Sequence, residues 1–416
     1  MNSNDRNQSV QTNSRSASPI YAQASLTSGQ LPALRLPIAT PRRHTSSAKY
    51  TFISMDPIKA PRLPAHIPSL DGLRALSICL VLFGHMAATN GAPLWLDRPS
   101  FTSLGNVGVR FFFIVSGFLI TTLMLRDIEK HGQIRLKLFY IRRSLRILPA
   151  AFCYIAIMWL LYMSGIIDLT FHLTSRTNAA SALPDLAHAL TFTANYQHDY
   201  NWYFNHLWSL SVEEQFYLIW PFTMFLLGTR RAVWAGLLML ALAPCFRLLM
   251  ILYSDGPEIR LSREFQAVAD ALATGCLAAM LHNKLGEWRW FISLTRWPAI
   301  PIGLMCVALG YGLAYASRPA AYLIGQTIAN IGIALILQHL VRHPTSAVSQ
   351  ILNTRFLVKI GVLSYSLYLW QQPFLNFQST HWVASFPQNI ALAFGAAILS
   401  HRLVERPFLK LKERIA

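Results

Sequence analysis

The chain has 416 residues, of which 53% are hydrophobic and only 13% are charged. Soluble proteins carry about 25% charged residues, so this composition argues against a soluble globular protein and favours a polytopic membrane protein. The formal net charge of +18 would suggest nucleic-acid binding in a soluble chain. Here the basic residues gather in short connections between apolar segments, where they act as topology signals, so no nucleic-acid partner is expected.

Residues 1–62 are rich in Ser, Thr, Pro and basic residues and contain no apolar run long enough for a signal peptide. We expect them to form a disordered basic tail. Because Met55 precedes the first apolar segment, residues 1–54 are alternatively an over-extended start. A leader rich in Ser and Arg is also typical of organellar transit peptides, although this one lacks a clear amphipathic helix.

From residue 70 onward, apolar segments recur at lengths suited to a hydrocarbon core about 30 Å thick. They predict ten transmembrane helices near residues 70–89, 105–125, 147–165, 206–227, 232–253, 265–282, 297–316, 321–341, 358–378 and 386–405. The bias of Lys and Arg toward one set of loops places both termini in the cytoplasm. The predicted fold is therefore an all-α membrane domain over residues 63–408, followed by a basic cytoplasmic tail over residues 409–416.

The first apolar segment carries Arg74 near its start and His85 eleven residues later. Eleven residues make about three helical turns, so both side chains share one face, about 16 Å apart along the axis. An Arg at membrane depth costs about 2.5–3.5 kcal/mol on insertion scales, so a functional pocket is favoured. The structural alternative is that Arg74 reaches back to the interface while His85 caps a carbonyl of a neighbouring helix.

A basic run over residues 139–149 lies where the third predicted helix leaves the cytoplasm. Arg143 and Arg146 are three residues apart and share a helix face, an arrangement suited to phosphate oxygens. A cluster that only sets topology is the alternative. The presence of Arg74 on the same side favours phosphate binding.

The longest connection, about residues 166–205, lies on the predicted outer side and contains many aromatic and amide side chains. These side chains suit stacking on and hydrogen bonding to a sugar, and Tyr196 and Trp202 are candidate acceptor-binding residues. An aromatic belt at the membrane interface is the alternative. The sequence contains no internal repeat, which weakens the case for an inverted-repeat transporter.

The fourth predicted helix begins with His206, Ser209 and Glu213 on one face, while Glu214 points about 100° away. Buried carboxylates need partners, so these acids either orient His85, bind acceptor hydroxyls or pair with an arginine such as Arg247. We take Glu213 and Glu214 as catalytic candidates and His206 as an acceptor-binding candidate. Asp270, within a later apolar segment, is open to the same alternatives.

The run over residues 108–120 places Ser116 and Gly117 inside an aromatic helix. Small residues in such a helix more often permit close helix packing than catalyse a reaction. The five cysteines lie within apolar segments and show neither metal-ligand spacing nor a disulfide framework, so no metal site is expected.

Several of these runs, taken in order, resemble the membrane-bound acyltransferase-3 family, which includes bacterial polysaccharide O-acetyltransferases. The resemblance rests on residues 70–74 with His85, 108–120, the Arg143 and Arg146 pair, 206–221, 364–370 and 404–408. It implies a ten-helix membrane domain, an acyl-CoA donor on the cytoplasmic side, and essential roles for Arg74, His85, Arg143 and Arg146. One departure is Gln371, where relatives often have His.

These observations predict a multi-pass enzyme of the inner (plasma) membrane that transfers an acyl group other than aminoacyl, with acetyl expected. The donor is acyl-CoA as co-substrate, no cofactor is expected, and the acceptor is a hydroxyl of a surface or exported carbohydrate. His85 either takes the hydroxyl proton or carries the acyl group, and the sequence leaves both routes open.

Three alternatives remain: acylation of a small lipophilic or macrolide-like alcohol, a transporter, and a membrane glycosyltransferase. A glycosyltransferase would need clustered acids to bind a metal, and Asp185 and Asp199 are too isolated in the sequence to supply them.

Overall fold

The computed structural model describes residues 58–415 apart from residues 62, 65, 88, 97–100, 102 and 255–257. Most of the expected basic tail therefore lies outside the described residues. In the described part of the chain, β pairing is limited to isolated bridges between Phe171 and Asn178 and between His172 and Asn201. All other regular elements are helical, and they run in the order α1 (Pro68–Met86), η1 (Leu94–Leu96), α3 (Leu104–His131), α4 (Leu136–Met163), α5 (Leu183–Leu190), η2 (Ala194–Tyr196), α6 (Trp202–Asn205), α7 (Leu207–Tyr253), α8 (Glu258–Arg263), α9 (Phe265–Met280), α10 (His282–Leu285), α11 (Arg289–Leu294), α12 (Ala299–Ala316), α13 (Arg318–Ala320), η3 (Ala321–Gly325), α14 (Gln326–Arg342), α15 (Ala347–Leu352), α16 (Arg355–Trp370), η4 (Trp382–Ala384), α17 (Gln388–Ser400), η5 (His401–Glu405) and α18 (Arg406–Arg414).

Helices occupy the ten ranges in which membrane spans were expected, which confirms the all-helical class. Within the described residues, six helical stretches are long and apolar enough to cross a bilayer by themselves. Three helices at expected spans, α9, α16 and α17, have 16, 16 and 13 residues. Each is too short for that criterion, although α17 continues without a break into η5 and α18. The count of ten spans and the placement of the termini stay predictions.

The helix α7 covers two expected spans because its two halves join at Gly228. This residue has φ 71° and ψ 167°, a left-handed φ that glycine adopts at little cost. Large apolar side chains project from the first half, including Leu218 (65% exposed) and Phe222 (51% exposed). Such a contiguous apolar face is typical of a surface that meets lipid.

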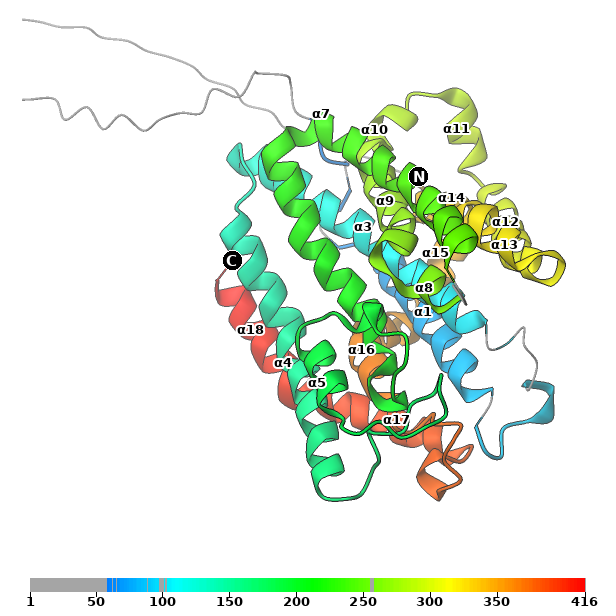
Figure 1. Cartoon of the computed structure of the whole chain (residues 1–416). Helices are drawn as coiled ribbons and strands as arrows, with labels where there is room; N and C mark the ends of the chain where they lie inside the picture. The colour runs from blue at the N-terminus through cyan, green and yellow to red at the C-terminus, as the bar shows by residue number, and fades with distance from the viewer. Residues whose placement is uncertain are drawn as a thin grey trace, which may run out of the picture. The chain divides into compact units, whose positions relative to one another are not determined.

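The centre of the bundle is α3, which is the most buried of the candidate spans in the described chain. It packs against α1 on one side and α9 on another, and α9 packs against α7 (Figure 1). A Cβ on Gly117 of α3 would lie 2.2 Å from the Leu272 carbonyl oxygen, and one on Gly275 of α9 would lie 2.1 Å from the Ile114 carbonyl oxygen. Gly117 therefore permits close helix packing, as its sequence context predicted.

The helix α16 packs along α1. At Gly361 an added Cβ would lie 1.9 Å from the Asp71 carbonyl oxygen, so only glycine permits this approach. The contact matters for function because the start of α16 lies beside the start of α1. The end of α16, followed by Gln371 and Gln372, consequently lies beside the end of α1, where His85 is found.

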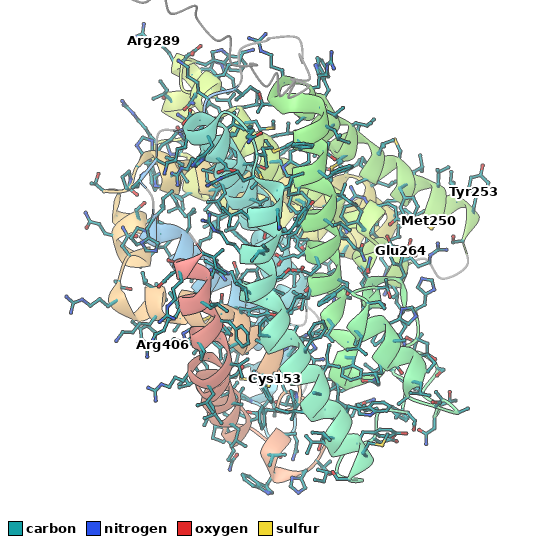
Figure 2. The ribbon with its side chains drawn as sticks, turned by 90° about the vertical axis from the view of Figure 1, so that its left-hand side faces the viewer. Cys153, Met250, Tyr253, Glu264, Arg289 and Arg406 are labelled. Carbon is teal, nitrogen blue, oxygen red and sulfur yellow. The ribbon has the colours of Figure 1, made fainter. Side chains whose placement is uncertain are left out.

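Two ends of the bundle can be distinguished. The basic end contains the start of α4 with Arg143 and Arg146, and the loop end contains the connection over residues 166–205. Figure 2 shows α18, which begins at Arg406, alongside α4, which carries Cys153. The C-terminal helix thus returns along the same face of the bundle as the basic run.

The connection at the loop end is tied together by polar contacts. His172 contacts two carboxylates, with 2.8 Å between Nε2 and Asp185 and 3.3 Å between Nδ1 and Asp199. Partial burial alone would raise the pKa of Asp199, but hydrogen bonds from Ser175 and the nearby His172 lower it below its ordinary value. The two acids, which are isolated in the sequence, are therefore neighbours in space. Within the described ranges, no group of three or more His, Cys, Asp or Glu side chains is placed to hold a metal ion.

Candidate functional site

Three arginines that the sequence singled out meet in one cavity of about 250 Å³, here called the arginine cavity. Arg74 comes from α1, and Arg143 and Arg146 come from neighbouring turns of α4. Glu213, on α7, lines the same cavity. The structure therefore brings three guanidinium groups into a space large enough for part of a small ligand, an arrangement suited to binding phosphate oxygens.

Aromatic and hydroxyl groups hold the arginines in place. The Arg143 guanidinium lies 3.6 Å from the centre of the Tyr217 ring, a cation–π contact. The Tyr217 hydroxyl in turn hydrogen-bonds with Ser116. Arg74 lies 3.7 Å from Asp71, one turn earlier on α1. Ser116 thus makes a polar contact in the cavity wall, while its neighbour Gly117 permits close helix packing.

The two candidate acids of α7 have different surroundings. Glu213 lines the arginine cavity, whereas Glu214 is not among the residues that line it. In the described chain, Oε1 of Glu214 is buried without a hydrogen-bond partner. Arg247, which the sequence offered as a partner for either acid, instead lies 2.9 Å from Asp270. Asp270 therefore has the structural pairing role, and Glu213 and Glu214 remain candidates for chemistry.

His85 lines a second, smaller cavity of about 90 Å³, here called the histidine cavity. Its wall also includes His206, Asn205 and Arg263 from the loop end of the bundle, together with Tyr368 from α16. Asn205 Oδ1 has no hydrogen-bond partner among the described residues. The histidine cavity thus combines the partly buried imidazole of His85 with polar groups that are able to bind a small polar group.

A chain of amide hydrogen bonds orients the imidazole of His85. The Gln372 side-chain amide donates to the Trp202 carbonyl oxygen at 2.8 Å, and the Gln371 amide donates to Gln372 Oε1 at 2.8 Å. Gln371 Oε1 is then left facing His85 Nδ1 at 2.8 Å. Because a carbonyl oxygen only accepts, His85 must donate from Nδ1, so in the neutral ring Nε2 keeps its lone pair.

The arginine cavity and the histidine cavity share two wall residues, Val109 and Tyr368. The Tyr368 hydroxyl donates to the His206 carbonyl oxygen at 2.8 Å and also hydrogen-bonds with Ser209. These contacts hold the tyrosine ring between the two spaces. Arg74 and His85, three turns apart on α1, accordingly open into adjoining cavities and not into one.

The three residues expected to bind an acceptor lie in different places. Trp202 contacts His85, with 5.6 Å between the ring centres, and His206 is buried against the rings of Tyr154 and Tyr368. Tyr196 is 38% exposed and its hydroxyl donates to Gln266. It lines neither the arginine cavity nor the histidine cavity. Only Trp202 and His206 are therefore close to His85.

Sequence reasoning missed Arg263, Tyr368 and the role of Gln371. Arg263 contacts Tyr200, to which it donates a 2.8 Å hydrogen bond, and in the described chain it forms no ion pair within 4 Å. Arg263 lies on the predicted outer side of the membrane, which carries few basic residues. The positive-inside rule therefore does not account for it, and this signal could have identified it as a functional candidate. The resemblance covered Tyr368 and named Gln371 as a departure, but their contacts could not be predicted, because their neighbours come from distant parts of the chain.

Comparison with known proteins supports the family resemblance that the sequence motifs indicated. The acyltransferase-3 family, described as an acyltransferase domain, matches residues 67–400. Among curated proteins, the peptidoglycan O-acetyltransferase OatA of Listeria monocytogenes is 29% identical over 385 residues, covering 83% of this chain and 56% of the relative. The O-acetyltransferase OatA of Staphylococcus aureus is 28% identical over 381 residues, covering 83% of this chain and 58% of the relative.

The chain thus spans a little more than half the length of the curated relatives that it matches. No solved structure matches the chain significantly. The family match covers α1, all the arginines of the arginine cavity, and both histidines of the histidine cavity. This multi-pass membrane protein therefore belongs to the acyltransferase-3 family.

Proposed function

We propose that the protein is a membrane O-acyltransferase that moves an acyl group, with acetyl expected, from acyl-CoA to a carbohydrate hydroxyl. One observation carries the proposal. The arginine cavity and the cavity that contains His85 share Tyr368 and Val109 as a common wall. This shared wall supports a route on which the proposed phosphate-binding groups and the proposed proton acceptor lie in adjoining spaces.

On the donor side, the arginine cavity suits the phosphates of coenzyme A. Arg74, Arg143 and Arg146 offer fork-shaped donors, and a phosphate takes such donors in pairs. The thioester lies at the end of a long pantetheine arm, so it can reach past Tyr368 toward His85 while the phosphates stay with the arginines. We place the basic end in the cytoplasm, where acyl-CoA is available, and the protein in the inner membrane.

At the reacting end, His85 Nε2 is placed to act as a general base because Nδ1 is committed to Gln371. The acceptor oxygen attacks the thioester carbonyl carbon as its proton passes to Nε2. The carbon–sulfur bond then breaks, and the departing thiolate takes the proton. The products are an acyl ester and free coenzyme A, with His85 returned to its starting state. Transient acylation of His85 is the competing route, and Glu213 and Glu214 remain proposed contributors to catalysis.

On the acceptor side, Trp202 and His206 lie against the histidine cavity and belong to the loop end of the bundle. Aromatic surfaces with nearby amides and hydroxyls are suited to sugars. The relatives named above are O-acetyltransferases, one of them of peptidoglycan, a carbohydrate polymer. This supports a carbohydrate of the cell surface, or one in export, as the acceptor.

The test uses the purified full chain in proteoliposomes, with radiolabelled acetyl-CoA and a panel of oligosaccharides. We expect the label to enter an oligosaccharide, and His85→Ala to abolish the transfer while membrane insertion stays normal. The matched control is His381→Ala, which removes an exposed histidine at the loop end. Retained transfer in His85→Ala contradicts the assigned role of His85.

The same assay separates the alternatives. Label recovered only in an added lipophilic alcohol would replace the carbohydrate by a membrane-soluble acceptor. Solute flux without any acyl transfer would indicate a transporter. Transfer from a donor other than acyl-CoA, with acetyl-CoA inactive, would overturn the donor assignment.

A further inference from the structure

A third cavity adjoins the histidine cavity at the loop end. It has a volume of about 220 Å³ and is bounded by α3, α8, α12 and η3, and we call it the tyrosine cavity after Tyr311 and Tyr322 in its wall. It shares Asn106, Val109 and Trp208 with the histidine cavity. The sequence singled out none of its tyrosines.

One face of α3 connects all three cavities. Val109 lines each of them, Asn106 lines the histidine and tyrosine cavities, and Phe113 lines the arginine and tyrosine cavities. Spacings of three and four residues place these side chains on one stripe of a helix. The stripe continues to Ser116 and Ile120 in the arginine cavity. The three spaces are therefore arranged along α3.

The wall of the tyrosine cavity is suited to a sugar. Gln326 Oε1 accepts hydrogen bonds from both Arg110 and Arg247, so its amide hydrogens stay available; no hydrogen bond from Nε2 is found among the described residues. Glu258 and Arg318 form an ion pair at the wall and add both an acceptor and donors. Planar aromatic surfaces with convergent polar groups are the usual features of carbohydrate sites.

A competing entrance exists at the same end of the bundle. A cavity of about 150 Å³, here called the loop cavity, is lined by Asp168, Trp202 and Ser379, among others. It shares no lining residue with the histidine cavity, and the Trp202 ring lies between it and His85. The loop cavity is thus closed off from His85 by a side chain that is only 5% exposed.

We propose that the tyrosine cavity is the acceptor-binding site, holding an oligosaccharide whose reacting hydroxyl passes Asn106 and Trp208 to reach His85. This inference rests on the proposed function and specifies where its acceptor binds. It replaces the long loop by the wall between α3, α12 and η3 as the main determinant of acceptor choice. Trp202 then serves to position His85 and not to hold the sugar.

The first test measures binding without activity. Cysteine is introduced by Ala314→Cys in the tyrosine cavity and by Ser379→Cys in the loop cavity, each in the full chain in proteoliposomes. The unsubstituted chain reports background labelling of its own thiols, among which Cys245 is exposed. Maleimide labelling is followed with and without two probes, an oligomer of β-1,4-linked N-acetylglucosamine and a glucan oligomer of equal length.

We expect one probe to slow labelling of Ala314→Cys about tenfold at about ten times its dissociation constant, and to leave Ser379→Cys unchanged. A maleimide adduct on Ala314→Cys should then block transfer to the oligosaccharide but spare slow hydrolysis of acetyl-CoA. Protection of Ser379→Cys, or of neither variant, overturns the proposal. If Ala314→Cys is protected but the unsubstituted chain acylates no saccharide, this binding site stands and the proposed function fails.

A second pair of variants tests the stacking surface. Tyr322→Ala removes an aromatic side chain from the cavity wall, and Tyr315→Ala removes one that is 75% exposed and outside the wall. We expect Tyr322→Ala to raise the KM for the oligosaccharide about tenfold, with the KM for acetyl-CoA unchanged. Equal effects of the two substitutions on the oligosaccharide KM contradict a stacking role.

Discussion

His85 Nδ1 lies 2.8 Å from Gln371 Oε1, although the two residues are 286 positions apart in the sequence. The amide group of Gln371 is itself oriented by Gln372, whose amide donates to a backbone carbonyl. The backbone carbonyl oxygen at the end of this series of hydrogen bonds has no hydrogen to donate. It therefore fixes which group donates and which accepts in each bond of the series. The result is a defined tautomer of His85, in which the lone pair of Nε2 is available for the proposed proton transfer.

This relationship predicts the effect of removing the amide. Gln371→Met has a similar volume but cannot accept the Nδ1 hydrogen, so the ring loses its preferred tautomer. We expect kcat to fall about 10- to 100-fold, as is typical when a supporting hydrogen bond to a functional histidine is lost. The KM for acyl-CoA should stay unchanged, because the arginine cavity is not altered.

The rescue variant is Gln371→His, since a ring nitrogen is also able to accept this hydrogen. Activity near that of the unsubstituted chain in Gln371→His, together with a loss in Gln371→Met, supports a positioning role. Equal activity in all three proteins would show that the orientation of His85 does not depend on Gln371.

We predict that removing an arginine from the arginine cavity weakens the binding of acyl-CoA selectively. Each charge-assisted contact contributes about 1.5–3 kcal/mol, so Arg143→Ala and Arg146→Ala should each raise the KM for acyl-CoA about 10- to 100-fold. The KM for the acceptor should change much less. Arg289→Ala is the matched control, because Arg289 is exposed and lies outside the cavity (Figure 2).

Reporter fusions at both ends of the chain accompany these kinetic measurements. If the variant that combines Arg143→Ala with Arg146→Ala has an inverted topology, the two arginines act as positive-inside signals and not as phosphate ligands. Normal topology with unchanged kinetics would remove acyl-CoA from the arginine cavity.

We predict that substitution of Arg263 slows the chemical step. Its guanidinium lines the histidine cavity. In the proposed reaction, this is where negative charge would develop on the thioester carbonyl oxygen during attack. Arg263→Lys keeps the charge but loses the fork geometry and the flat contact with Tyr200. We expect kcat to fall about 100-fold or more with little change in either KM. The control is Arg260→Lys, which alters the ion pair with Glu264 outside the cavity.

We expect a sharp boundary in the N-terminal region between residues that can be deleted without effect and residues that support the fold. Removal of residues 1–54 should leave activity intact, because no motif or membrane segment lies there. Removal of residues 1–64 also deletes a segment that is hydrogen-bonded to the bundle. Arg126, for example, donates to the carbonyl oxygens of Leu63 and Pro64, and Asn283 donates to that of Ala60.

Each of these hydrogen bonds contributes about 0.5–1.5 kcal/mol, so the longer deletion should lower the melting temperature of the detergent-solubilised protein. Arg126 also lines the arginine cavity, and we therefore expect weaker binding of acyl-CoA as well. Loss of activity on deletion of residues 1–54, with normal insertion, would assign a function to the tail.

The sequence alone determined the class of the protein and singled out three arginines that share one cavity in the structure. Long apolar segments have few alternatives to membrane helices, since backbone groups in lipid must be paired within the segment. Arg74 was found because a charge at membrane depth is costly, and Arg143 and Arg146 because they form a pair within a basic run on the same side. Their helical spacing also predicted the shared face of Arg143 and Arg146, because this depends only on local geometry.

Only the tertiary structure decided which partners these residues have. It paired Arg247 with Asp270 and placed Glu213 in the arginine cavity. It also placed Gln371 beside His85 through the glycine contact between α16 and α1. Tyr368, Arg263 and the tyrosine cavity combine side chains from helices far apart in the sequence. Periodicity reveals which face of a helix is special, but the neighbour of that face depends on how the helices pack.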